Sequence, residues 1–246
     1  MIDLHCHILP GTDDGAEDID ESLDMARVAA ADGIHTLVAT PHVGNGVYAP
    51  TPENVDDAVA VLQRVLNQHR IPLKIIAGAE MHLRPGLRDL YRSGRGPTIG
   101  GNGRFMLLEL PVHAVPPGAS ELIFSFKMDG ITPILAHPER NTAIQQDPDI
   151  LLQLVETGAL VQVTAMSVTG AFGSRAGACA ARLLKRRLVH VIASDAHDAD
   201  YRRPALTAAV AAAAEILGDR TQALDLVTRI PQHILDGAVP QVPEPH

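Results

Sequence analysis

The sequence has little cysteine and no long apolar run. Its 246 residues include only Cys6 and Cys179, which are too few for a disulfide framework and are compatible with reduced thiols. No apolar run reaches the length of a membrane-spanning helix, and the first residues lack the basic start and long apolar core of a signal peptide. We therefore expect a cytoplasmic protein that does not insert into membranes.

Positive charge is also scarce. The chain carries 20 lysine and arginine residues against 29 aspartate and glutamate residues, a formal net charge of -9. This balance removes the general attraction to nucleic acid phosphates that a basic face would supply, so we expect no nucleic acid partner. A local positive site for an anionic group remains compatible with the composition.

The order of apolar segments predicts an α/β fold in one domain. Strand and helix patterns alternate about seven times without a linker between them, and the chain is long enough to bury one large core. Continuous apolar strands such as Leu73 to Ala77 are typical of parallel strands covered by helices. We predict a single domain over residues 1–238 and a proline-rich tail over residues 239–246.

Helices are predicted between these strands. The clearest begins at Thr51-Pro52, because threonine can cap a helix and proline suits the first helical position. The other expected helices cover residues 19–32, 86–92, 120–128, 149–156, 176–186 and 204–217.

Residues that bind metals follow almost every predicted strand. His5 and His7 point to the same side of the first strand because side chains alternate between its faces. The later strands are followed by His42, Glu80, Glu109, His137, and the pair Asp195 and His197. Since the carboxyl ends of such strands meet on one face, these side chains should converge there. Imidazole and carboxylate ligands suit zinc, iron or manganese, so the pattern predicts a multinuclear metal site.

Each of these residues also has an ordinary explanation. His5 alone could be a core histidine, Glu109 could cap a helix or pair with an arginine, and Asp13-Asp14 could form a solvated turn before Gly15. Buried carboxylates beside several histidines are costly without compensation, which favours metal ions for the set as a whole. The histidines outside this set, such as His82 and His113, are expected at the surface or in packing.

Six segments together resemble a known superfamily. They are Ile2 to Gly11 with Asp13-Asp14-Gly15, Thr40-Pro41-His42, Gly78-Ala79-Glu80, Leu108-Glu109, Ala136 to Arg140, and Ala193 to His197. In this order they resemble the PHP superfamily, named for polymerase and histidinol phosphatase. Within it, the chain is most similar to the metal-dependent protein-tyrosine phosphatases of bacterial capsule and exopolysaccharide operons. The resemblance implies a distorted (β/α)7 barrel, phosphoester hydrolysis and up to three divalent ions, usually manganese, with iron or zinc as alternatives.

The resemblance also implies a division of the ligands among three ions. The first ion would be held by His5, His7, Glu80 and Asp195; the second by the bridging Glu80 with Glu109 and His137; the third by Asp14, His42 and His197. Three divalent ions would exceed the negative charge of these carboxylates, and a phosphate dianion would balance the excess.

Three arginines are candidates for substrate binding. The resemblance makes Arg140 a phosphate clamp, and its planar fork fits phosphate oxygens in a two-point geometry. The competing explanation is an ion pair with Glu139 or another acid. Arg202 and Arg203 follow Asp195 and His197 closely enough to reach the same face, and the sequence does not distinguish between them.

The expected chemistry is metal-assisted hydrolysis, because coordination can lower the pKa of water to about 7. Cysteine-dependent tyrosine phosphatases need an arginine at a set distance after the cysteine. Here Thr12 stands at that distance from Cys6, and Lys185 at that distance from Cys179, which disfavours that class.

Three functions compete. The leading prediction is a protein-tyrosine phosphatase that acts on the phosphotyrosine of a bacterial tyrosine autokinase. A histidinol-phosphatase or another small-molecule phosphoesterase is second, and a non-catalytic metal-binding regulatory module is third. An amidohydrolase is disfavoured because Glu80 and Glu109 stand where such enzymes supply a bridging lysine. One departure from the family, Thr164 to Ser167 in place of a polar Asn-Ser-Ser-type stretch, weakens the transfer of substrate preference, although Gly170-Ala171-Phe172-Gly173 is retained.

Overall fold

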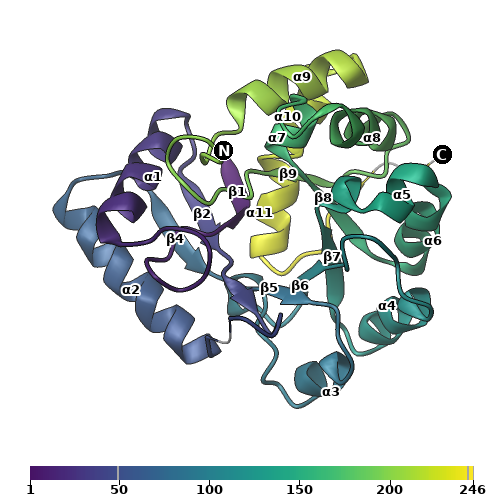
Figure 1. Cartoon of the computed structure of the whole chain (residues 1–246), viewed down its shortest axis with the longest axis horizontal. Coiled ribbons are helices and arrows are strands. Elements are labelled where there is room, and N and C mark those ends of the chain that lie inside the picture. Colours follow the sequence, from purple (N-terminus) through teal and green to yellow (C-terminus); the bar gives the residue numbers. More distant parts are fainter. Residues whose placement is uncertain (49, 243, 246) are drawn as a thin grey trace.

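The computed structural model describes residues 1–48, 50–242 and 244–245. Its strands are parallel and lie at the centre of the view in Figure 1, surrounded by helices, as the α/β prediction requires. The strands are β1 (Ile2–Cys6), β2 (Thr36–Ala39), β3 (His42–Val43), β4 (Lys74–Ala77), β5 (Glu80–His82), β6 (Phe105–Glu109), β7 (Thr132–Ala136), β8 (Leu160–Thr164) and β9 (Val191–Ala193).

The helices confirm the local sequence signals. Thr51 caps α2 by accepting from Asn54 N, and Pro52 begins the helix. All seven predicted helices are present, with ends shifted by no more than a few residues: α1 (Ile19–Ala31), α2 (Pro52–Gln68), α3 (Leu87–Arg92), α4 (Ala119–Met128), α6 (Asp149–Thr157), α8 (Ser174–Lys185) and α9 (Thr207–Leu217). Shorter helices were not predicted, since they show too little periodicity: η1 (Ile99–Gly101), η2 (Pro138–Arg140), α5 (Thr142–Gln146), α7 (Ala165–Val168), α10 (Arg220–Asp225) and α11 (Arg229–Leu235).

Two of the predicted strand segments are each divided into two short strands, β2 with β3 and β4 with β5. As a result the strands form two separate sheets. The orders are β1-β2-β4 and β3-β5-β6-β7-β8-β9. Pro41 lies between β2 and β3, where a residue without an N–H cannot continue the ladder. Gly78 lies between β4 and β5, and a Cβ there would be 2.8 Å from Val38 Cγ1. His42 and Glu80 therefore begin second, short strands instead of ending the first ones.

The strand series returns to β1 through a few separate contacts. At the amino ends, Ile2 N donates to Val227 O at 2.8 Å and Ile192 N donates to Leu226 O at 3.1 Å, so the chain after α10 fills the space between β1 and β9. At the carboxyl ends, an isolated bridge joins Cys6 to Ala196. The last strand thus lies beside the first in an irregular ring of two sheets, which agrees with the distorted barrel that the family resemblance implies.

The apolar strands and inner helix faces form one buried core. None of the described helices has both the length and the apolar character needed to cross a membrane. In the predicted tail, residues 239–242, 244 and 245 form no helix or strand, while residues 243 and 246 lie outside the described part of the chain. The domain boundary at residue 238 stays a prediction.

Candidate metal centre

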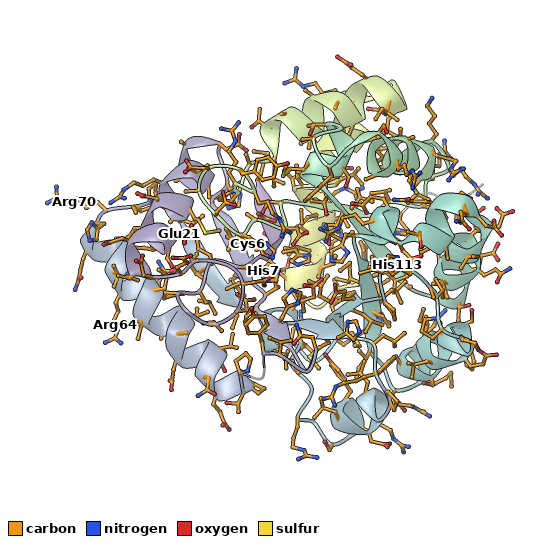
Figure 2. The ribbon with its side chains drawn as sticks, viewed as in Figure 1. Cys6, His7, Glu21, Arg64, Arg70 and His113 are labelled. Carbon is orange, nitrogen blue, oxygen red and sulfur yellow. The ribbon has the colours of Figure 1, made fainter. Side chains whose placement is uncertain are left out.

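The carboxyl ends of the strands bring all nine predicted ligands together. They surround or underlie a cavity of about 260 Å³. Its wall includes Asp14, His42, Glu80, Glu109, His137, Asp195 and His197, while His5 and His7 are fully buried against these residues. Figure 2 shows His7 in the middle of the molecule, whereas Arg64 and Arg70 project from its edge.

The first group of ligands lies at the end of β1. His5 Nε2 is 3.1 Å from His7 Nε2, 3.3 Å from Glu80 Oε2 and 3.4 Å from Asp195 Oδ1. His7 Nε2 faces the same two oxygens at 3.5 and 3.6 Å. His5, His7 and Glu80 therefore form a group compact enough to share one ion, and Asp195 faces both imidazole nitrogens from beside it.

Glu80 connects this group to a second one. Its Oε1 lies 2.9 Å from His137 Nε2, and its Oε2 lies 3.0 Å from His42 Nδ1. The Glu109 carboxylate faces the same two rings, each at 4.0 Å. The central position of Glu80 supports the bridging role that the family resemblance implies.

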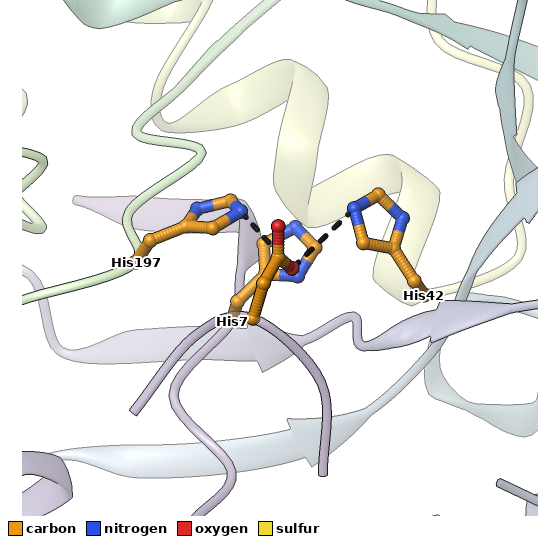
Figure 3. Close-up of side chains that lie close together, drawn as sticks. His7, His42 and His197 are labelled. Carbon is orange, nitrogen blue, oxygen red and sulfur yellow. Dashed lines mark ion pairs between the residues drawn. The ribbon is translucent and has the colours of Figure 1, made fainter. Parts of the chain in front are cut away.

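Asp14 completes a third group from a loop. Its Oδ1 is 3.6 Å from His42 Nε2 and 3.6 Å from His197 Nε2. Figure 3 shows the rings of His7, His42 and His197 close together, with dashed lines for the two ion pairs to this carboxylate. The ring centroids of His7 and His197 are 4.0 Å apart.

Two buried atoms show that these residues fit metal ions. His42 Nδ1 and Glu80 Oε2 are 3.0 Å apart, yet neither has a hydrogen-bond partner of suitable geometry among the described residues. Buried polar atoms without partners are costly, and a coordinated cation would satisfy both. The nitrogen and oxygen donor set suits manganese, iron or zinc.

The electrostatics of the cluster depend on its carboxylates. Burial alone would lower the pKa of His5, but Glu80 and Asp195 outweigh burial and raise that pKa to about 9. His42 shows the same balance, with burial opposed mainly by Glu80 and a resulting pKa of about 9. Burial would raise the pKa of Glu80 and Asp195, and nearby positive groups, His5 first, hold both well below their usual range. A metal must therefore displace protons from these imidazoles when it binds.

Two buried residues orient the β1 histidines, and the sequence did not assign these roles. His7 Nδ1 donates to Asp13 Oδ2 at 2.6 Å, and His5 Nδ1 donates to Gln162 Oε1 at 2.9 Å. Each bond leaves Nε2 directed at the cluster, as outer partners of metal-binding histidines do. Gln162 had a usable signal, since it is a polar residue inside an otherwise apolar strand.

Asp13 is itself held by the turn that contains it. Asp13 accepts from His42 N at 2.9 Å and from Gly15 N at 3.1 Å. A Cβ on Gly15 would lie 2.0 Å from His7 O, so only glycine permits this approach. The Asp13-Asp14-Gly15 segment is thus a structured part of the site, and the alternative of an ordinary solvated turn is wrong for Asp13.

His82 also differs from its sequence interpretation. Its Nδ1 lies 3.2 Å from Glu109 Oε2, so it contacts a candidate metal ligand and does more than fill surface or core space. His113 is exposed and does not line the cavity, in line with the expected surface position.

The structure separates the three candidate arginines. Arg140 Nη2 and Arg202 Nη2 donate to the same atom, Asp195 Oδ2, at 2.8 and 2.9 Å, and both side chains line the cavity. Arg203 is exposed and is not among the cavity residues. The acid beside Arg140 is Asp195; Glu139 is instead buried, and its Oε1 accepts from Thr164 N at 3.0 Å.

Two candidate ligands have unusual backbone conformations. His137 has φ of 34° and Asp195 has φ of 52°, a left-handed region that residues other than glycine rarely adopt. Asp195 is held there by its N–H bond to His5 O at 2.8 Å. Strain of this kind persists where surrounding contacts enforce it, and it concentrates at functional sites.

Comparisons with known proteins agree with this geometry. The sequence model of the family described as capsular polysaccharide synthesis, CpsB/CapC, matches residues 1–236. The tyrosine-protein phosphatase YwqE of Bacillus subtilis (strain 168) is 41% identical over 203 residues, which are 82% of this chain and 79% of that protein.

Solved structures extend the comparison to three dimensions. One match comes from the crystal structures of YwqE from Bacillus subtilis and CpsB from Streptococcus pneumoniae, which are described as unique metal-dependent tyrosine phosphatases. It superposes with a TM-score of 0.95 at 34% sequence identity, and the superposition covers 100% of this chain and 98% of the matched chain. A second match is a histidinol phosphate phosphatase from Lactococcus lactis, solved with zinc, L-histidinol and phosphate. Its TM-score is 0.57 at 11% sequence identity, and the superposition covers 91% of this chain and 94% of the matched chain. This likeness indicates a shared fold.

Proposed function

This chain belongs to the CpsB/CapC family of capsular polysaccharide synthesis, and we propose that it is a metal-dependent protein-tyrosine phosphatase. The observation that carries the proposal is the meeting of two kinds of group over one cavity. Metal-type ligands lie on one side of the Asp195 carboxylate, and two arginines lie on its other side. Such a cavity can bind a phosphate group between cations and guanidinium donors.

We assign the ions to the three groups of ligands described above. As the family resemblance implies, His5, His7, Glu80 and Asp195 would hold one ion, Glu80 with Glu109 and His137 a second, and Asp14 with His42 and His197 a third. The most compact groups of donor atoms differ in part, because His42 takes the place of His137 beside Glu80 and Glu109, and Asp195 lies outside the group of His5, His7 and Glu80. Manganese is the proposed metal. Bound divalent ions activate water and stabilise the charge that develops on phosphate oxygens during hydrolysis.

The chain's own residues supply the remaining tasks. Arg140 and Arg202 would donate to phosphate oxygens in the fork geometry of guanidinium, while Asp195 Oδ2 keeps both groups at the cavity before substrate arrives. Asp13 and Gln162 hold the β1 imidazoles with Nε2 toward the cluster. Leu110 and Val112 give the cavity an apolar wall against which an aromatic ring can pack.

We propose phosphotyrosine protein as the substrate, and a tyrosine autokinase of capsule synthesis as the partner. A tyrosine side chain suits this site because phenolate, with a pKa of about 10 in free tyrosine, leaves more readily than an alkoxide. Histidinol phosphate remains the second candidate, because the Lactococcus lactis phosphatase has the same fold. The cytoplasmic location predicted from the sequence stays a prediction.

Substrate preference tests the proposal. We expect the manganese-loaded protein to hydrolyse a phosphotyrosine peptide with a kcat/KM on the order of 10-fold or more above that for a phosphoserine peptide or histidinol phosphate, since the better leaving group lowers the barrier. The three substrates are to be compared in parallel at one pH and metal concentration. Preference for histidinol phosphate would favour the second candidate, and hydrolysis of none would favour a non-catalytic module.

A further inference from the structure

One aromatic ring lies beside both cavity arginines. The guanidinium carbon of Arg140 is 5.2 Å from the centroid of Phe172, and that of Arg202 is 5.6 Å from the same centroid. Both distances are within the range in which a cation is attracted to the face of a ring. Phe172 is half-buried and lies outside the main apolar core, so its position is not explained by core packing.

A short turn between α7 and α8 fixes this ring. Phe172 N donates to Met166 O at 3.2 Å, and Gly173 N donates to Gly170 O at 3.0 Å. Gly170 and Gly173 have φ of 82° and 95°, values that glycine adopts without strain. The Gly170 to Gly173 segment noted in the sequence therefore places an aromatic side chain at a defined point beside the cavity.

The two guanidinium groups need such support. They carry like charges and share one acceptor atom, Asp195 Oδ2. Arg202 Nη2 also donates to the backbone oxygen of Asp195 at 3.1 Å, while its Nε is buried and has no hydrogen-bond partner among the described residues. If a bound phosphate replaced Asp195 Oδ2 as the acceptor of either arginine, the ring would still contact that guanidinium group beside the cavity.

We propose that Phe172 is a positioning residue that holds Arg140 and Arg202 ready to bind the phosphate group of the substrate. This inference rests on the proposed function, since it assigns Phe172 to the same phosphate site. Phe172 acts through the two arginines, by the attraction between its ring face and their guanidinium groups. An aliphatic side chain of similar size would preserve packing and lose that attraction.

Titration with inorganic phosphate tests the proposal without depending on turnover. The full-length, manganese-loaded Phe172→Leu variant should bind phosphate about 10-fold more weakly than the wild type in calorimetry, with unchanged metal content and melting temperature. Phe172→Tyr, which retains the ring, should restore binding to within about twofold. Phe124→Leu, the same change at an exposed phenylalanine of α4, is the matched control and should have no effect on phosphate binding.

A second variant separates positioning from a merely structural role. In the Arg202→Lys background, which removes one planar guanidinium group, Phe172→Leu should weaken phosphate binding by only about threefold. A full 10-fold effect in that background would overturn the proposal, as would wild-type phosphate affinity in Phe172→Leu. If the wild type bound no phosphate at all, both the proposed function and this inference would fail; if phosphate binds but phosphotyrosine is not hydrolysed, only the function fails.

Discussion

Two buried histidines at opposite ends of the strands have opposite electrostatic properties. His190 precedes β9 at the amino ends, is 2% exposed, and accepts from Val161 N at 3.0 Å through Nδ1. Burial lowers its pKa to about 4. His5 lies at the carboxyl end of β1 and is 0% exposed, yet burial is outweighed by Glu80 and Asp195 and its pKa rises to about 9.

Burial alone therefore does not determine the charge of an imidazole. At the amino ends, a neutral histidine pairs with backbone and serves the scaffold. At the carboxyl ends, carboxylates from separate strands surround the ring and keep it ready for a proton or a metal ion. Acidic side chains around a buried histidine therefore mark it as a functional candidate. A raised pKa is not required, because burial lowers the pKa of the candidate ligand His197 to about 3 although Asp14 and Asp195 lie beside it.

Removal of a metal ligand should cause the largest loss of phosphatase activity. It tests the carboxyl-end side of the comparison, where His5 lies. His7→Ala, Glu80→Ala and Asp195→Ala should each lower kcat by more than about 100-fold, because even the loss of an outer partner of a metal ligand commonly costs 10 to 100-fold. Phosphatase assays are to be paired with elemental analysis. Chelation of the wild type should abolish activity, and added manganese should restore it. The exposed His113→Ala is the control, and near-normal rates in all three variants would refute the site.

Loss of a cavity arginine should have a smaller effect and leave the metal centre intact. Arg140→Ala should lower kcat/KM on the order of 10²-fold, as expected when a donor positioned for transition-state charge is removed. Metal content should not change. Arg203→Ala is the matched control because that arginine is exposed outside the cavity, and it should retain nearly full activity. Unchanged kinetics with a lowered melting temperature in Arg140→Ala would instead indicate a purely structural ion pair with Asp195.

Acidification should have the smallest effect on activity, because it acts through His190 on stability and not on the cavity. Its folded-state pKa of about 4 lies below the usual 6.5, so its contribution to stability is present above pH 6.5 and is lost as the pH falls through 4. The total loss is on the order of 3 kcal/mol. His190→Asn keeps an acceptor for Val161 N without titrating, so the free energy of unfolding of the wild type should fall relative to this variant over that range.

Denaturant unfolding of chelated samples at pH 7, 5.5 and 4 measures this difference, since the titration of the metal cluster is common to both proteins and cancels. A difference between the two proteins that does not vary with pH would contradict the assigned environment of His190. Substitution at His190 should also leave the metal content of the folded protein unchanged, in contrast to His7→Ala.

Features that depend on neighbours along the chain could be predicted from the amino-acid sequence alone. Thr51-Pro52 specified the start of α2 through a cap and a fixed φ, and the apolar runs specified parallel strands, because these signals act within a few residues. The series from His5 to His197 could be recognised for the same reason, since each ligand is tied to the end of a local strand pattern.

Contacts between residues that are distant in sequence could not be predicted in this way. The choice of Arg202 over Arg203, the pairing of Gln162 with His5, and the place of Phe172 beside two arginines all depend on contacts across strands and loops. The strand break at Gly78 also depends on packing, since Val38 Cγ1 leaves no room for a Cβ there, whereas the break at Pro41 follows from a local property, the missing N–H. Local patterns set which way a side chain points from its own strand, but its partners are set by the twist and register of the whole ring, which no short segment encodes.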